Sequence, residues 1–257
     1  MFSFGTIDNL STFLSRCGSI SLCMDMKTFQ IAIDGPVAAG KGTTAKMVAQ
    51  RLGYLYVDTG AMYRSLTLYA KNCKVDWNDE NGIVKLLAND LPKVELSIPT
   101  ELEKDGRLCT VKLNGVDVSW QIRTEEISQG VSVITQYAGV RDYITPLARE
   151  IGQRQNVVME GRDITTVVLP DADLKIYMDA DPKERAMRRH RELMSRGEDV
   201  SYEEVFTQLV ERDKRDSERT IAPLKKAQNA WILDTTGMTI DEVANMIVER
   251  VNKQRMI

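Results

Sequence analysis

The sequence predicts an α/β domain in which helices flank a parallel five-stranded sheet. Two observations lead to this prediction. Short apolar runs alternate with segments of helical spacing, as they do in strand–helix–strand units. A stretch of period-two segments interrupts this alternation and indicates a small antiparallel insertion. A length of 257 residues, of which 43% are hydrophobic, suits one domain with such an insertion.

The first two strand–helix units come from the stretch that begins at residue 29. Phe29–Ile33 is a short apolar run, which predicts a buried strand that ends in a glycine-containing loop. Thr43–Leu52 places its apolar residues on one helical face. Tyr54–Val57 predicts the second strand, and residues 61–71 return to helical spacing.

Period-two segments follow and predict the antiparallel insertion. Strands are expected at Val94–Ile98, Cys109–Leu113 and Val116–Val118. Asn114-Gly115 joins the last two of these strands. Asn-Gly between alternating strands is typical of a type I′ hairpin turn, because both central residues need a positive φ.

The rest of the chain returns to the strand–helix pattern. Two helices are expected at 124–137 and 140–155, and Pro146 should kink the second or mark its first turn. The remaining sheet strands are expected at Val157–Met159, Leu174–Met178 and Trp231–Leu233. Helices near 182–196, 202–218 and 239–253 should complete the domain.

Composition and charge exclude several classes of function. Lys plus Arg number 34 against 37 Asp plus Glu, and this balance argues against a disordered chain or a polybasic nucleic-acid arm. The four cysteines include no C-x-x-C pair. The single histidine, His190, lies among arginines and suits neither a zinc site nor the base of a hydrolase triad.

No apolar run approaches the ~20 residues of a membrane helix, so we expect a soluble, cytoplasmic protein. Residues 1–26 lack the basic and apolar regions of a signal peptide, and we expect a poorly ordered extension there. An over-extended start codon is the alternative explanation, since Met24 and Met26 directly precede the first strand.

Residues 35–41 match the phosphate-binding pattern G-x-x-x-x-G-K between a predicted strand and a predicted helix. Successive backbone N–H groups and the helix N-terminus form an anion cradle there, and the lysine reaches the β- and γ-phosphates of a nucleoside triphosphate. The residues expected to bind ATP are Gly35, Pro36, Val37, Ala38, Ala39, Gly40, Lys41, Gly42 and Thr43. Because Gly42 stands where a hydroxyl usually follows the lysine, magnesium contact should pass to Thr43, directly or through water. An ordinary glycine-rich turn is the alternative interpretation.

A phosphorylated second substrate would require cationic side chains from separate segments. Arg64 and Arg162 both follow strand ends, where open α/β sheets bind ligands. Further candidates are Arg141, Arg212 and Arg219. For any one of these arginines, a solvated surface charge is the alternative.

Five motifs in order give these arginines a context. They are G-P-x-x-x-G-K-G-T at 35–43, Asp58–Arg64, Ile122–Glu126, Gly161–Asp163 and Glu211–Arg219. The set resembles the bacterial cytidylate kinase family, and the resemblance runs from about Phe29 to the C-terminus. It implies a P-loop nucleoside-monophosphate-kinase fold for residues 27–257, with a core of residues 27–70 and 156–257, an acceptor-binding insertion at about 71–155 and a helical lid at about 183–200.

The resemblance also implies roles for the residues that match the family pattern. Thr59, Arg64, Arg162 and Arg219 would hold the acceptor phosphate, while Arg212 and Asp216 would hold the ribose. Ser132, Arg141 and Asp163 would bind the cytosine, which offers an amino donor to a carboxylate or hydroxyl and acceptors to an arginine. Lys41 and Arg162 would be the catalytic residues.

Three residues depart from the family pattern. Thr59 stands where many members have serine, and Glu160 where many have aspartate, and both changes are chemically mild. Thr165 stands where a glycine is common and could alter a backbone turn beside the base. Arg123 is a further candidate, for which an ion pair between the core and the insertion is an equally good interpretation.

Arg185, Arg188 and Arg189 share one face of the predicted lid helix and could close over the transferring phosphate. A surface helix with paired charges is the alternative. Lys plus Arg and Asp plus Glu balance between residues 183 and 219, so we expect no nucleic-acid groove there.

The resemblance therefore implies ATP-dependent phosphorylation of CMP, and of dCMP, to CDP and dCDP with release of ADP. Mg²⁺ is the expected cofactor, and we expect a monomer that binds no nucleic acid and no membrane. A P-loop kinase for another nucleoside monophosphate, such as UMP, is one alternative. A GTP-dependent switch protein is the alternative from another class, but although Asp79–Gly82 matches its D-x-x-G, the sequence has no N-K-x-D.

Overall fold

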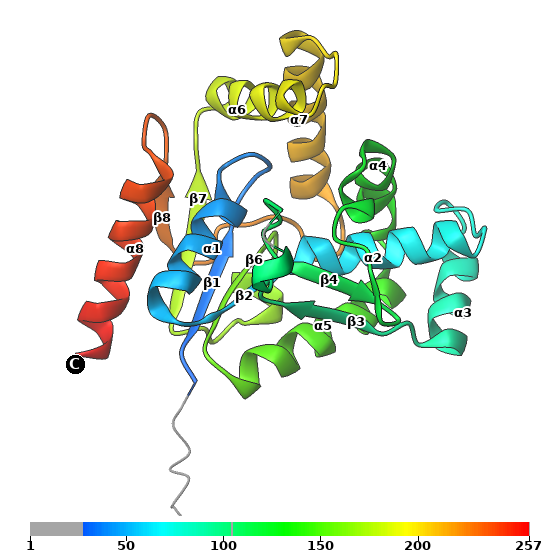
Figure 1. Ribbon diagram of the computed structural model, residues 1–257, viewed down its shortest axis with the longest axis horizontal. Helices are drawn as coiled ribbons and strands as arrows, with labels where there is room; N and C mark the ends of the chain where they lie inside the picture. Colours follow the sequence, from blue (N-terminus) through cyan, green and yellow to red (C-terminus); the bar gives the residue numbers. More distant parts are fainter. Residues whose placement is uncertain (1–27, 104, 257) are drawn as a thin grey trace, which may run out of the picture.

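The computed structural model describes residues 28–103 and 105–256, which form a parallel sheet surrounded by helices (Figure 1). The strands of the sheet are β1 (Gln30–Asp34), β2 (Leu55–Asp58), β6 (Val157–Gly161), β7 (Leu174–Asp179) and β8 (Trp231–Asp234). They lie in the order β2-β6-β1-β7-β8, and every pairing is parallel. The predicted five-stranded parallel sheet is confirmed. The extension predicted for residues 1–26 lies outside the described residues.

The central strands explain why helices surround the sheet. Every residue is buried from Ile31 to Asp34 in β1 and from Val157 to Met159 in β6. Successive side chains of a strand point to opposite faces, so both faces of this sheet must be covered. The helices are α1 (Lys41–Leu52), α2 (Thr59–Asn72), α3 (Glu80–Asp90), α4 (Glu125–Ile134), α5 (Ala138–Arg154), α6 (Pro182–Ser195), α7 (Tyr202–Glu218) and α8 (Ile240–Arg255).

The antiparallel insertion is a second, smaller sheet of β3 (Val94–Ser97), β4 (Thr110–Leu113) and β5 (Val116–Asp117), in that order. Its strands pair antiparallel, as the period-two pattern predicts. Asn114 and Gly115, between β4 and β5, have φ angles of 51° and 82°. The two positive angles confirm the geometry predicted for the Asn-Gly turn.

Three local features differ from the prediction. Helix α3 has no predicted counterpart, because only Ile83 and Leu87 are buried along it and its apolar stripe is weak. Pro146 lies in the interior of α5, so of the two predicted alternatives, a kink or a place in the first turn, the second is wrong. A short helical turn, η3 (Ile164–Val168), follows β6 where no element is predicted.

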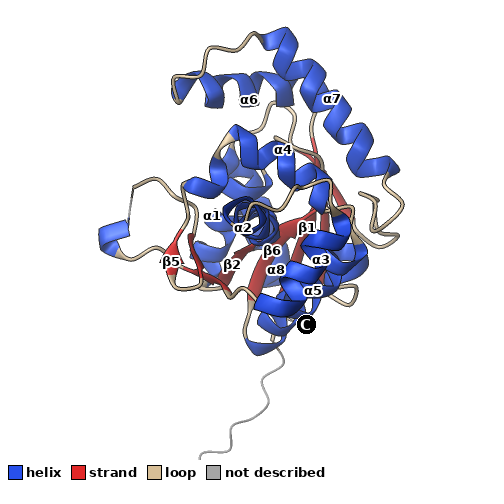
Figure 2. Cartoon of the chain, turned by 90° about the vertical axis from the view of Figure 1, so that its right-hand side faces the viewer, coloured by secondary structure: helices blue, strands red, loops and turns tan. Residues whose placement is uncertain are grey.

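The carboxyl ends of the sheet strands face the part of the molecule that carries α6 and α7. Figures 1 and 2 show these two helices projecting beyond the edge of the sheet at which β1 and β7 end. Ligands of parallel α/β sheets bind at this edge. Within the described residues, no helix has the length and apolar character needed to cross a bilayer.

Candidate active site

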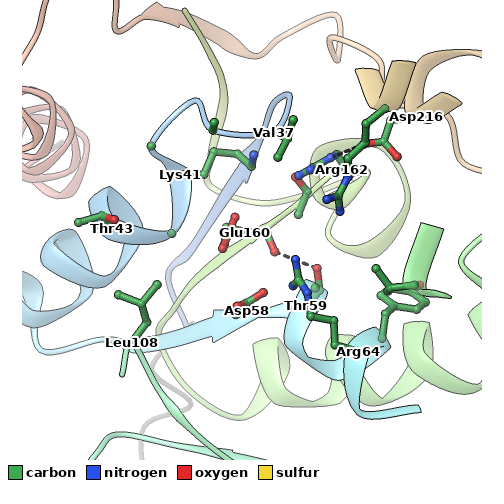
Figure 3. A pocket seen from close by; sticks show the side chains of 18 of the residues that line it. Val37, Lys41, Thr43, Asp58, Thr59, Arg64, Leu108, Glu160, Arg162 and Asp216 are labelled. Atoms are coloured by element: carbon green, nitrogen blue, oxygen red, sulfur yellow. Dashed lines mark hydrogen bonds and ion pairs between the residues drawn. The ribbon is translucent and has the colours of Figure 1, made fainter. Parts of the chain in front are cut away.

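A cavity of about 600 Å³ lies at this edge, and side chains from segments far apart in the sequence line it (Figure 3). The predicted site residues that line it are Val37, Ala38, Gly40, Lys41, Gly42, Thr43, Thr59, Arg64, Ser132, Arg141, Arg162, Asp163, Arg188, Arg189, Arg212, Asp216 and Arg219. Gly35, Pro36 and Ala39 belong to the same loop but do not line the cavity, and neither does Arg185.

The loop between β1 and α1 forms one wall of the cavity. Gly35 is required there, since a Cβ at this position would lie 2.0 Å from the carbonyl oxygen of Met178. Gly40 is the N-cap of α1 with a φ of 84°, so the helix begins at Lys41, two residues before the predicted start. The N-terminus of α1 therefore faces the cavity with its free N–H groups, which suits an anion.

Lys41 is buried, and its Nζ donates to the carbonyl oxygen of Pro36 at 2.7 Å. Burial lowers the pKa of Lys41 to about 7, and the nearby charge of Arg162 acts in the same direction. Figure 3 shows Lys41 and Glu160 close together at the centre of the cavity, while Thr43 lies apart from them on α1. A phosphate beside Lys41 would favour the charged form of the lysine.

Four arginines line the opposite part of the cavity: Arg64, Arg162, Arg212 and Arg219. Burial lowers the pKa of Arg64, and burial together with the charges of Arg162 and Arg64 lowers that of Arg212 to about 9. The Nε atoms of Arg64 and Arg212 are buried and find no hydrogen-bond partner among the described residues. Asp216 offsets one charge, because it accepts a hydrogen bond from Arg162 Nε at 2.8 Å. The surplus of cationic donors suits a multiply charged anion such as a phosphate.

The far end of the cavity holds a buried ion pair between Arg141 of α5 and Asp163, which follows β6. Arg141 also donates to the carbonyl oxygen of Thr135 at 3.2 Å, and its guanidinium lies 5.6 Å from the centre of the Tyr63 ring. Ser132 of α4 also lines the cavity. The N–H donors of a guanidinium and a carboxylate acceptor thus lie side by side. This arrangement suits a nucleobase that carries a hydrogen-bond acceptor next to a hydrogen-bond donor.

Arg123 pairs with Asp58, its Nη2 lying 2.7 Å from Asp58 Oδ2. Asp58 also accepts from the backbone N–H of Ala61 and so caps α2. Because Asp58 ends β2 and Arg123 belongs to the short helix η2 (Gln121–Arg123), the pair joins the core to the insertion. The ion-pair interpretation of Arg123 is confirmed, and Arg123 lines the cavity as well.

The model of the cytidylate kinase family matches residues 31–253 of the chain. The chain belongs to the cytidylate kinase family. It is 45% identical over 228 residues to the cytidylate kinase of Bacillus licheniformis, which covers 89% of this chain and 98% of that protein. The cytidylate kinase of Carboxydothermus hydrogenoformans is 44% identical over 225 residues, with 88% and 98% of the two chains covered.

The three arginines predicted to lie on one face of the lid do not act together in this member of the cytidylate kinase family. Arg185 is buried, and it donates to the carbonyl oxygens of Ala180 and Val37 at 3.0 and 3.1 Å and to Asp213 at 2.6 Å. Arg188 and Arg189 line the cavity instead. The reason is geometric: the side chain of Arg185 enters the junction between α6, α7 and the phosphate loop.

Two acidic residues are not identified as functional candidates from the sequence: Glu160, which lines the cavity, and Asp34, which is buried beside it without lining it. Glu160, noted only as a departure from the family pattern, lines the cavity and accepts a hydrogen bond from the Tyr56 hydroxyl at 3.1 Å. Burial raises the pKa of Glu160, and it raises the pKa of Asp34 to about 6. Each lies at the carboxyl end of a buried strand, and this is the signal that could have identified them.

Thr165 does not adopt a positive φ, so its backbone needs no glycine. Its N–H and its hydroxyl both donate to Asp34, at 2.7 and 2.6 Å. The departure from the family's glycine therefore adds a hydrogen bond rather than straining the turn.

Proposed function

We propose that the protein transfers the γ-phosphoryl group of ATP to CMP, and to dCMP, and releases ADP. The observation that carries this proposal is one cavity that has the phosphate loop on one wall and the arginine cluster on the other, each of which suits an anion. The Arg141 and Asp163 pair beyond the arginines supports cytosine as the acceptor base. Family membership supports the same reaction.

The arrangement supports specific roles for the acceptor-side residues. Thr59, Arg64, Arg162 and Arg219 hold the acceptor phosphate, and Arg212 and Asp216 hold the ribose. Asp163 accepts a hydrogen bond from the amino group of cytosine, and Arg141 and Ser132 complete the contacts to the base. Uracil presents a carbonyl where cytosine has the amino group, so two hydrogen-bond acceptors, that carbonyl and the Asp163 carboxylate, would face each other and repel.

Transfer in such a site needs no protein nucleophile. An oxygen of the acceptor phosphate attacks the γ-phosphorus in line, and the bond to the ADP oxygen breaks as the new bond forms. Lys41 and Arg162 neutralise the charge of the transferring group from its two sides, and the fixed geometry supplies most of the remaining rate acceleration.

Mg²⁺ fits the donor set of this site. The described residues contain no cluster of three or more His, Cys, Asp or Glu side chains, but Mg²⁺ bound to phosphates needs only one or two carboxylates. Glu160, at the centre of the cavity, would hold it, and Thr43, which lies apart from Glu160 on α1, would contact it only through water. Mg²⁺ held there would supply positive charge that offsets the negative charge of the phosphates.

Residues 183–200 act as a lid in this proposal. Arg188 and Arg189 supply its contacts to the phosphates, and closure excludes water that would otherwise hydrolyse ATP. Arg189 Nη2 lies 3.7 Å from Glu125 of α4, so an ion pair spans the gap between the lid and the acceptor side.

A coupled assay of ADP release with CMP, dCMP, UMP and AMP tests the proposal. We expect CMP and dCMP to be phosphorylated with similar kcat/KM, and UMP and AMP at least about tenfold less efficiently. Equal efficiency with UMP would favour the alternative of a broader nucleoside-monophosphate kinase. GTP hydrolysis without an acceptor would favour a switch protein, although the chain has no N-K-x-D segment to recognise guanine.

A further inference from the structure

Asp34 is the last residue of β1 and directly precedes the phosphate loop, yet its carboxylate binds a segment of the acceptor side. Its side chain is fully buried. Oδ1 accepts from the N–H of Ile164 at 2.8 Å, and Oδ2 accepts from the N–H and the hydroxyl of Thr165 at 2.7 and 2.6 Å. These donors belong to the first residues of the turn η3, so Asp34 caps that turn from another strand.

Asp163 is the residue at the N-cap position of η3, but its own side chain makes no capping hydrogen bond. An aspartate at an N-cap ordinarily accepts from the N–H of the second or third residue of the helix. The N–H of the second residue, Thr165, is held by Asp34. The carboxylate of Asp163 instead faces the acceptor cavity, where it pairs with Arg141 and lies 3.5 Å from Arg219 Nη2.

We propose that Asp34, assisted by the hydroxyl of Thr165, caps η3 in place of Asp163 and thereby keeps the Asp163 carboxylate turned toward the acceptor base. Asp34 is then a positioning residue for base selectivity, and this role rests on the proposed contact between Asp163 and cytosine. Without the Asp34 carboxylate, two buried N–H groups would lose their acceptor, which is costly. Asp163 is the adjacent carboxylate in sequence and would turn to cap them, leaving Arg141.

The same reasoning gives Thr165 a function. A glycine at this position would offer Asp34 only its N–H, whereas threonine adds a second donor to the same oxygen. The hydroxyl therefore strengthens the attachment of the start of η3 to Asp34. The N–H groups of η3 then stay bonded to Asp34 and are not available to Asp163.

The ratio of kcat/KM for CMP to kcat/KM for UMP measures this effect, because a general structural defect would lower kcat/KM for both substrates by the same factor. Asp34→Asn keeps the shape but turns an amide N–H₂ toward donor groups. We expect it to lower the ratio about tenfold, and Thr165→Val to lower it about threefold. Thr165→Ser, the matched control, keeps the hydroxyl and should leave the ratio unchanged. The KM for ATP should stay within about twofold in all three variants.

Asp163→Asn serves as the reference variant. If it leaves the ratio unchanged, the proposed contact between Asp163 and the base is wrong, and the role of Asp34 fails with it. If Asp163→Asn lowers the ratio but Asp34→Asn and Thr165→Val do not, only the role of Asp34 is overturned. If Asp34→Asn does not fold, the Thr165→Val and Thr165→Ser pair decides by the same criterion.

A double variant tests whether Asp34 acts through Asp163. In the Asp163→Asn background, Asp34→Asn should lower the ratio no further, since the carboxylate that it positions is already gone. A further fall equal to that of Asp34→Asn alone would contradict the proposal.

Discussion

Replacing Arg185 with glutamine separates two accounts of helix α6, which we propose to be part of a lid. In the structure the Arg185 guanidinium is buried and bridges Asp213 of α7, the carbonyl oxygen of Val37 in the phosphate loop, and the start of α6. Breaking a buried ion pair typically costs ~3–5 kcal/mol. The Asp213 side chain is 21% exposed and keeps some access to water, so we place the cost for Arg185→Gln at roughly 2–3 kcal/mol.

For a domain of this size, each kcal/mol lowers the melting temperature by about 2–4 °C, so Arg185→Gln should melt roughly 4–12 °C below the unmodified protein. Arg191→Gln is the matched control, because Arg191 is exposed on the same helix and should shift the melting temperature little. Thermal unfolding is measured beside kcat and the KM for ATP. An Arg185→Gln protein that melts with the control but loses a hundredfold in kcat would refute the buried bridge and restore Arg185 to the transferring phosphate.

Three further predictions concern the cavity. Lys41→Met should leave the fold intact and lower kcat roughly a hundredfold or more, since it removes the lysine cation of the phosphate loop, and near-normal turnover would count against that role. Because we propose that the charged form of Lys41 binds phosphate, and because burial lowers its pKa to about 7, kcat/KM for ATP should fall as the pH rises through that value, whereas Lys41→Arg should remove this dependence. Asp216→Ala should lower kcat/KM about tenfold for CMP and UMP alike, because Asp216 is assigned to the sugar that both share, and a changed ratio between the two would contradict this assignment.

The sequence predicts best the features that depend on consecutive residues. The phosphate loop, the alternating core strands and the Asn114-Gly115 turn are local patterns, and the structure contains each of them. The sequence does not predict helix α3, because only two residues along it are buried and its apolar periodicity is weak.

Contacts between distant segments are harder to predict, because periodicity carries no information about which side chains meet. The spacing of Arg185, Arg188 and Arg189 predicts one shared face, but it cannot show that Arg185 turns into the junction with Val37 and Asp213. Asp34 and Thr165 are likewise far apart in the sequence, and only the parallel pairing of β1 with β6 brings them together.

The central claim is that one cavity holds both nucleotides, and a crystal structure with CMP and a non-hydrolysable ATP analogue bound tests it most directly. We expect the triphosphate on the loop around Lys41, the CMP phosphate among Arg64, Arg162 and Arg219, and the cytosine amino group within hydrogen-bond distance of the Asp163 carboxylate. A cytosine that lies away from Asp163 and Arg141, or a CMP phosphate seated on the loop around Lys41, would contradict the proposed site.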